Sequence, residues 1–144
     1  MTAIESPDLL LVEDNPDDVE LMLRAFKRAR LSNPVQVARD GVDALDFLFP
    51  KDGAARAVLP RVVLLDLKLP RVNGLEVLAR IRSNERTKRL PVVILTSSRE
   101  EPDIQRAYEL GANSYIVKPV EFEKFMDVSE KIDVYWTVVN QPLG

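Results

Sequence analysis

The sequence predicts a doubly wound α/β domain, in which a five-stranded parallel sheet carries helices on both faces. Two observations lead to this prediction. Short apolar runs recur along the chain, and each is followed by a longer segment with apolar residues at helical spacing. Three of the runs are continuous rather than alternating, which is typical of strands buried on both faces of a parallel sheet. Strands that alternate regularly with helices favour parallel pairing through crossover connections.

Five apolar runs are expected to form the strands of this sheet. The runs at residues 9–12, 62–65 and 92–95 are continuous, whereas those at 35–38 and 114–117 are weaker. A continuous run suits the middle of a sheet that helices cover on both faces, because every side chain is then buried. The two weaker runs are therefore expected to lie nearer an edge.

The segments that follow the runs have apolar residues three and four positions apart, as amphipathic helices do. The expected stripes are, in chain order, Val19, Met22, Leu23 and Phe26; Val42, Leu45, Leu48 and Phe49; Gly74, Val77, Leu78 and Ile81; Ile104, Ala107, Tyr108 and Gly111; and Phe122, Phe125, Ser129, Ile132, Trp136 and Val139. Each stripe is expected to pack against the sheet, and the last one belongs to the longest helix.

The chain, residues 1–144, is expected to form one domain with a core at about 7–139, because 144 residues is an ordinary length for a single domain. The one long connection, at 50–60, begins and ends with proline and is expected to be a surface loop. The N-terminus lacks the basic and apolar segments of a signal peptide, and no apolar run is long enough to span a membrane. A cytoplasmic protein with no membrane partner is therefore expected.

The composition excludes several kinds of chemistry. The chain has no cysteine and no histidine, which removes disulfides, thiolate nucleophiles, Cys/His zinc sites and imidazole bases. It has 20 Lys and Arg residues against 23 Asp and Glu residues, a net charge of −3, whereas nucleic-acid binders usually carry a basic excess. No glycine-rich phosphate-binding motif follows the first strand, which disfavours nucleotide-dependent enzymes. Carboxylate, hydroxyl, lysine and backbone groups are left to carry the function.

Polar side chains stand at the ends of four of the predicted strands. Glu13 and Asp14 follow the first strand, Asp66 the third, Thr96 the fourth and Lys118 the fifth. In open parallel sheets, ligands bind at the carboxyl ends of the strands. A single acid at such a place is usually a turn former or a helix cap. Five polar residues at corresponding strand ends instead favour a functional site.

The physics of this group of side chains points to a metal and a phosphoryl group. Carboxylates placed a few ångströms apart repel one another, and one of them would normally take up a proton. Mg²⁺ relieves that repulsion, since it prefers oxygen ligands from one or two carboxylates together with water and phosphate. A nearby lysine can bind phosphoryl oxygens, and an aspartate beside the metal is a suitable nucleophile toward phosphorus.

Four segments of the chain also carry a resemblance to a known family. They are residues 10–15, 64–74, 93–97 and 111–119, which include the motifs Leu-Leu-Val-Glu-Asp-Asn, Leu-Leu-Asp-Leu-Lys-Leu-Pro, Val-Ile-Leu-Thr-Ser and the final Lys-Pro. In this order they resemble the receiver domain of bacterial two-component response regulators, over essentially the whole chain. The resemblance implies a flavodoxin-like sheet with strand order 2-1-3-4-5 and a phosphoryl group that comes from a sensor histidine kinase.

The same resemblance implies roles for the residues of the metal site. Asp66 would be the phosphoryl acceptor. Glu13, Asp14 and Asp66 would bind Mg²⁺, and the backbone carbonyl of Lys68 would complete the protein ligands of the metal.

Further residues would bind the phosphoryl group or respond to it. Thr96 and Lys118 would contact phosphoryl oxygens, and Tyr115 occupies the position of the family's switch aromatic. The bond between Lys118 and Pro119 would be cis, a state that is rare and usually serves a purpose. On side-chain chemistry alone, Tyr115 could instead be a strand aromatic that packs against a helix.

Flanking sequence narrows the resemblance to a subfamily. Residues 11–21, the loop at 50–60 and the ending at 135–142 resemble the single-domain regulators that partner phytochrome-type sensor histidine kinases. Those regulators dimerise through the face built by the fourth helix, fifth strand and fifth helix.

The last predicted helix carries more apolar side chains than one stripe requires. Val128, Tyr135 and Val138 lie off the stripe, and extra exposed apolar area usually marks an interface. A two-fold homodimer is the commonest solution, with these three residues in its interface. The alternative is that the loop at 50–60 or the C-terminal tail covers them.

The sequence therefore predicts a stand-alone signalling protein rather than an enzyme that turns over a free substrate. Phosphoryl transfer to the chain and self-hydrolysis would serve switching, and a sensor histidine kinase would be the partner. The competing hypothesis is a receiver-like interaction module that works without phosphorylation. The acidic pair and Asp66, Thr96 and Lys118 are all present, which counts against that alternative.

Overall fold

The computed structural model describes residues 9–28, 34–50 and 59–118, and strands alternate with helices throughout these ranges. The elements are β1 (Leu9–Val12), α1 (Pro16–Arg28), β2 (Val35–Ala38), α2 (Gly41–Leu48), β3 (Val62–Leu65), α3 (Gly74–Arg82), β4 (Val92–Thr96), α4 (Glu101–Glu109) and β5 (Ser114–Val117). The predicted strands agree with these, except that β4 runs one residue further, to Thr96. The helix predicted at 122–139 lies outside the described residues.

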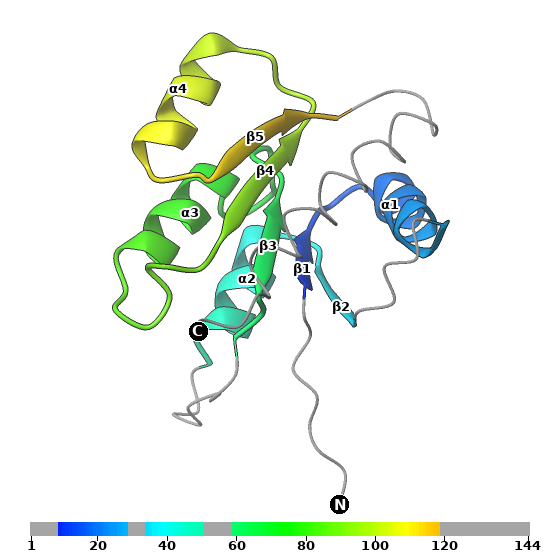
Figure 1. Cartoon of the computed structure of the whole chain (residues 1–144), viewed down its shortest axis with the longest axis horizontal. Helices are drawn as coiled ribbons and strands as arrows, with labels where there is room; N and C mark the ends of the chain where they lie inside the picture. The colour runs from blue at the N-terminus through cyan, green and yellow to red at the C-terminus, as the bar shows by residue number, and fades with distance from the viewer. Residues whose placement is uncertain (1–8, 29–33, 51–58, 119–144) are drawn as a thin grey trace, which may run out of the picture.

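All strand pairs in this part of the chain are parallel, in the order β2-β1-β3-β4-β5. The predicted doubly wound sheet and its order 2-1-3-4-5 are thus confirmed. Figure 1 shows α1 on one side of the sheet and α2, α3 and α4 on the other. The strands β2 and β5 stand at the two ends of this order and are less buried than β1, β3 and β4, as their weaker apolar runs predicted.

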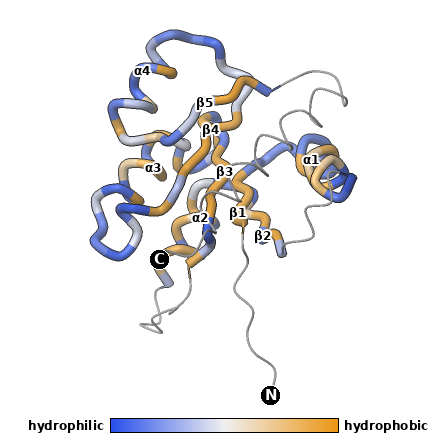
Figure 2. Tube along the Cα trace, viewed as in Figure 1, coloured by the Kyte–Doolittle hydropathy of each residue, from blue (hydrophilic) through white to orange (hydrophobic). Residues whose placement is uncertain are grey.

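The continuous apolar runs contribute side chains to two hydrophobic cores, one on each face of the sheet. Side chains along a strand point alternately to opposite faces. On β1 and β3, Leu10, Val12, Val63 and Leu65 pack on the side of α2, α3 and α4, while Leu9, Leu11, Val62 and Leu64 pack on the side of α1. Figure 2 shows apolar residues along the strands and mixed polarity along the helices. Each fully buried side chain of this size contributes about 1.5–3 kcal/mol.

The helical stripes are confirmed in part. In α1, Val19, Met22 and Phe26 are buried, but Leu23 is 38% exposed. The expectation that Tyr108 of α4 faces the core is wrong, because this residue is 50% exposed. The buried residue of α4 is Ala107, so only a narrow strip of this helix is buried against the rest of the protein. Tyr108 is the next residue and lies 100° further round the helix, which places it outside that strip.

None of the helices in the described part of the chain combines the length and the apolar character needed to cross a membrane.

Candidate functional site

The predicted site residues meet at one edge of the sheet. Glu13 follows β1, Asp66 follows β3, Thr96 ends β4 and Lys118 follows β5. The parallel pairing continues one residue beyond three of these strands. The backbone N–H of Glu13 donates to Ala38 O (2.9 Å), that of Asp66 to Val12 O (3.1 Å) and that of Lys118 to Thr96 O (2.7 Å). The sheet itself therefore fixes the backbone from which each side chain starts.

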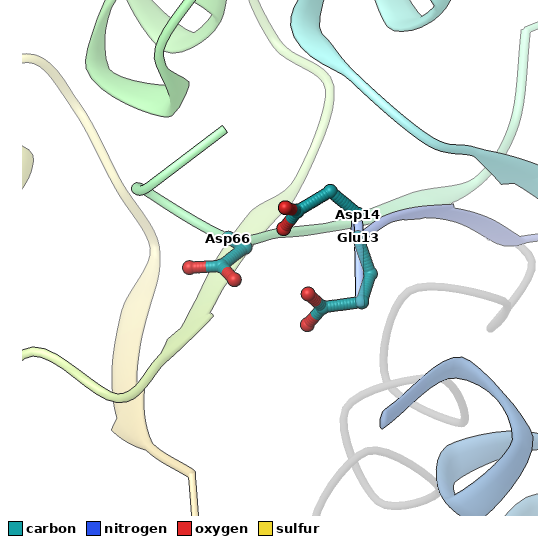
Figure 3. A group of neighbouring side chains, drawn as sticks. All are labelled: Glu13, Asp14 and Asp66. Carbon is teal, nitrogen blue, oxygen red and sulfur yellow. The ribbon is translucent and has the colours of Figure 1, made fainter. Parts of the chain in front are cut away.

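Three carboxylates converge there. Oxygen atoms of Glu13, Asp14 and Asp66 lie within 4.8 Å of one another, and Figure 3 shows the side chains approaching from the ends of β1 and β3. Glu13 and Asp66 are buried, while Asp14 is exposed. The group is thus reachable from solvent on the side of Asp14 and enclosed on the side of Glu13.

Lys118 pairs with two of these three carboxylates and with a further one, Asp18. Its ammonium donates to Glu13 Oε1, to Asp66 Oδ2 (2.9 Å) and to Asp18 Oδ2 (3.0 Å). The side chains of Lys118, Glu13 and Asp66 are all less than a tenth exposed. Asp18 was not among the predicted site residues. A weak signal was available, since it is an acid in the first turn of the helix that follows Glu13 and Asp14.

Burial and charge shift the protonation equilibria of two of these groups. Burial raises the pKa of Glu13 to about 7, with a further upward contribution from the charge of Asp66, and the hydrogen bond from Lys118 opposes the rise. Burial by itself would lower the pKa of Lys118. Its hydrogen bonds to Glu13, Asp66 and Asp18 outweigh burial and hold that pKa above its ordinary value. Near neutral pH the lysine is charged and Glu13 is close to its titration midpoint.

The donor set fits a hard divalent cation. Among the described residues, the ammonium of Lys118 pairs with Glu13, Asp18 and Asp66, and Asp14 adds a fourth carboxylate beside Glu13 and Asp66, so negative charge is in excess. Mg²⁺ and Mn²⁺ accept carboxylate oxygens and water, and a 2+ charge would offset this excess. Glu13, Asp14 and Asp66 are the residues that would hold the ion.

The loop after β3 fixes the Asp66 side chain. The backbone N–H of Lys68 donates to Asp66 Oδ1 (3.2 Å), and that of Gly74 donates to Leu67 O (2.8 Å). A side chain on Gly74 would collide with the backbone carbonyl of Asp66, so the start of α3 comes this close only because the residue is glycine. That the Lys68 carbonyl faces a metal stays a prediction.

A second hydrogen-bonded group surrounds Tyr115, next to the site. The Tyr115 hydroxyl donates to Ser98 O (3.0 Å), and Ser98 Oγ donates to Asp103 Oδ2 (2.6 Å) at the start of α4. Burial raises the pKa of Tyr115. Tyr115 also packs against the core on the side of α2, α3 and α4, as a strand aromatic would, and its role as a switch residue stays a prediction. The fully buried Thr96 accepts the Ser98 N–H at Oγ1 (3.4 Å), which joins this loop to the end of β4.

Four predicted residues, Pro119, Val128, Tyr135 and Val138, lie outside the described residues. The cis bond before Pro119 and the dimer interface therefore stay predictions.

Comparison with known proteins gives a consistent result. Residues 9–130 match the model of the response regulator receiver domain. The probable methanogenesis regulatory protein FilR2 of Methanothrix harundinacea is 45% identical over 136 residues, which cover 94% of this chain and 87% of FilR2.

Two solved structures are similar over nearly their whole length. The phosphorylated cyanobacterial phytochrome response regulator RcpA has a TM-score of 0.85 and 35% identity, with 95% of this chain and 98% of RcpA covered. The Mn²⁺-bound form of response regulator Rcp1 has a TM-score of 0.82 and 33% identity, with 96% of this chain and 98% of Rcp1 covered.

Proposed function

This chain belongs to the response regulator receiver domain family, and on that basis we propose that it accepts a phosphoryl group from a sensor histidine kinase onto Asp66. One observation carries the proposal. The Asp66 carboxylate lies in the group with Glu13 and Asp14, and the Lys118 ammonium contacts it at 2.9 Å. An acceptor, a place for a divalent cation and a fixed positive charge are therefore within a few ångströms of one another.

The chemistry that follows is an in-line displacement at phosphorus. A carboxylate oxygen of Asp66 forms a bond to phosphorus as the phosphorus–nitrogen bond of the kinase's phosphohistidine breaks, and the imidazole leaves with the electron pair and takes up a proton. The contacts to Lys68 N–H and Lys118 Nζ orient the attacking carboxylate. Bound Mg²⁺ supplies positive charge that offsets the negative charge of the phosphoryl oxygens.

The remaining site residues would respond to the phosphoryl group. Lys118 would exchange its contact with Asp66 for a phosphoryl oxygen, and the Thr96 hydroxyl would donate to another. A change at Thr96 reaches Ser98 through the hydrogen bond at 3.4 Å, and Ser98 O is the acceptor of the Tyr115 hydroxyl. The loop between β4 and α4 would thereby report phosphorylation. Later attack of water on phosphorus, with release of Asp66, would reset the switch.

We propose that this chain is cytoplasmic and that its partner is a phytochrome-type sensor histidine kinase. The support is the similarity to RcpA over nearly all of both chains and the flanking segments at 11–21 and 135–142. We also propose a stand-alone regulator that forms a homodimer through its last helix and the neighbouring strand.

The test is phosphorylation of the purified chain. The protein is incubated with Mg²⁺ and acetyl phosphate, and the modified fraction is followed by intact mass and by acid lability. Asp66→Asn should take up no phosphate while it stays folded, because an amide cannot attack phosphorus as a carboxylate does. Asp46→Asn, a change at an exposed acid of α2, is the matched control and should behave as wild type. Acid-labile phosphate on Asp66→Asn would contradict the assignment, and none on wild type would favour an interaction module that works without phosphorylation.

A further inference from the structure

The ammonium of Lys118 is held by carboxylates from three different segments. They are Glu13 at the end of β1, Asp66 after β3 and Asp18 in the first turn of α1. A lysine ammonium has three N–H donors, so these acceptors occupy all of them. Lys118 can therefore contact a phosphoryl oxygen only by giving up one of these partners.

Asp18 differs from the other two acceptors. Glu13 and Asp66 form the metal-binding group with Asp14, and Asp18 does not belong to that group. The side chain of Asp18 is 29% exposed, against 2% for Glu13 and 7% for Asp66, so it closes the solvent side of Lys118. Among the described residues, Asp18 is thus the partner of Lys118 that a metal at the acidic group leaves in place.

The start of α1 presents Asp18 in a fixed position. Asn15 Oδ1 accepts the backbone N–H groups of Asp17 (2.9 Å) and Asp18 (3.2 Å), which caps the helix directly after Glu13 and Asp14. The contact between Asp18 and Lys118 then joins α1 to the end of β5, across 100 residues of sequence. The carboxylate of Asp18 thus reaches the ammonium from a helical turn that Asn15 caps.

We propose that Asp18 is a positioning residue for phosphoryl transfer to Asp66: it holds the Lys118 ammonium at the site while metal and phosphoryl group engage Glu13 and Asp66. This inference rests on the proposed function. By positioning Lys118, Asp18 would raise the rate of phosphorylation. The negative charge of Asp18 by itself would lower that rate, because an additional anion repels an anionic phosphoryl donor. Removing the charge should therefore speed the reaction if Asp18 acts through space, and slow it if Asp18 positions Lys118.

The experiment compares the wild-type chain with Asp18→Asn, Asp18→Glu and Asp17→Asn. Asp17 is the matched control, because it is an exposed acid in the same helical turn and has no ion pair with another described residue. Phosphorylation by acetyl phosphate with saturating Mg²⁺ is measured by intact mass over a range of donor concentrations. Thermal unfolding of each variant is recorded alongside, and Asp18→Ser replaces Asp18→Asn if the latter does not fold.

Asp18→Asn is expected to lower the maximal rate by about tenfold or more, with a smaller change in the half-saturating donor concentration. Asp17→Asn should stay within about twofold of wild type, as expected for an exposed charge. Asp18→Glu keeps the carboxylate and should recover most of the rate.

If the maximal phosphorylation rate of Asp18→Asn equals or exceeds that of wild type, the inference about Asp18 is wrong, while the proposed function still stands. The same conclusion follows if Asp17→Asn loses as much of the rate as Asp18→Asn does. A wild-type chain that takes up no phosphate overturns the proposed function and this inference together.

Discussion

Lowering the pH from about 8 to about 6 should weaken divalent-metal binding about tenfold, because the pKa of Glu13 lies at about 7. A carboxylate must be ionised to bind the metal. With a pKa of about 7, roughly nine-tenths of Glu13 is ionised at about pH 8 and roughly one-tenth at about pH 6. With the ordinary value of 4.5, Glu13 would be almost fully ionised at both, and the affinity would hardly change.

The same shift has the opposite effect on the stability of the metal-free protein. The folded-state pKa of Glu13 is raised, so folding favours the protonated form. The stability contribution of this residue should therefore rise as the pH falls from above about 7 toward 4.5. A rise from 4.5 to about 7 corresponds to about 3 kcal/mol.

The assay is isothermal titration calorimetry of Mg²⁺ and of Mn²⁺ at a series of pH values, in buffers that differ in ionisation enthalpy. Near neutral pH, binding should release a fraction of a proton. Glu13→Gln should remove the steep pH dependence and weaken binding at every pH, whereas Glu20→Gln, at an exposed position of α1, should behave as wild type. An affinity that is constant between about pH 8 and about pH 6 would refute the reasoning about Glu13.

Three further predictions each concern the substitution of one residue. Gly74→Ala should lower the free energy of unfolding by about 1–3 kcal/mol, because its methyl group meets the Asp66 carbonyl, and an unchanged urea midpoint would contradict this. Tyr115→Phe should cost about 1 kcal/mol through the lost bond to Ser98 O and should shift amide signals of the loop between β4 and α4 in NMR spectra; unchanged signals would rule out the coupling. Arg82→Met should lower the free energy of unfolding by about 3 kcal/mol, because the Arg82 guanidinium donates to three backbone carbonyls and one side-chain amide oxygen. Chemical denaturation measures this change, and a loss of less than about 0.5 kcal/mol would show that these bonds are not important for stability.

Much of the fold could be predicted because its cause is local. The continuous runs in β1, β3 and β4 predict strands that are covered on both faces, and these strands lie at the centre of the observed order. The carboxyl ends of parallel strands share one edge, so the approach of Asp66 to Glu13 and Asp14 could also be expected. Tyr108 shows where this reasoning fails. Its spacing fits a stripe, but the width of the buried strip on α4 depends on how closely the helix packs, and Ala107 is the residue of α4 that is buried.

By itself, the sequence determined which chemical groups stand at the end of each strand, and that the strands pair in parallel, because both follow from short-range periodicity and from the rules for parallel connections. The strand order 2-1-3-4-5 was implied by the resemblance to receiver domains. Only the tertiary structure decided that Lys118 reaches Asp18, a residue 100 positions away, as well as Glu13 and Asp66. That choice depends on the rotation of α1 about its axis and on the reach of a lysine side chain. These are set by packing across the sheet, and no local sequence pattern encodes them.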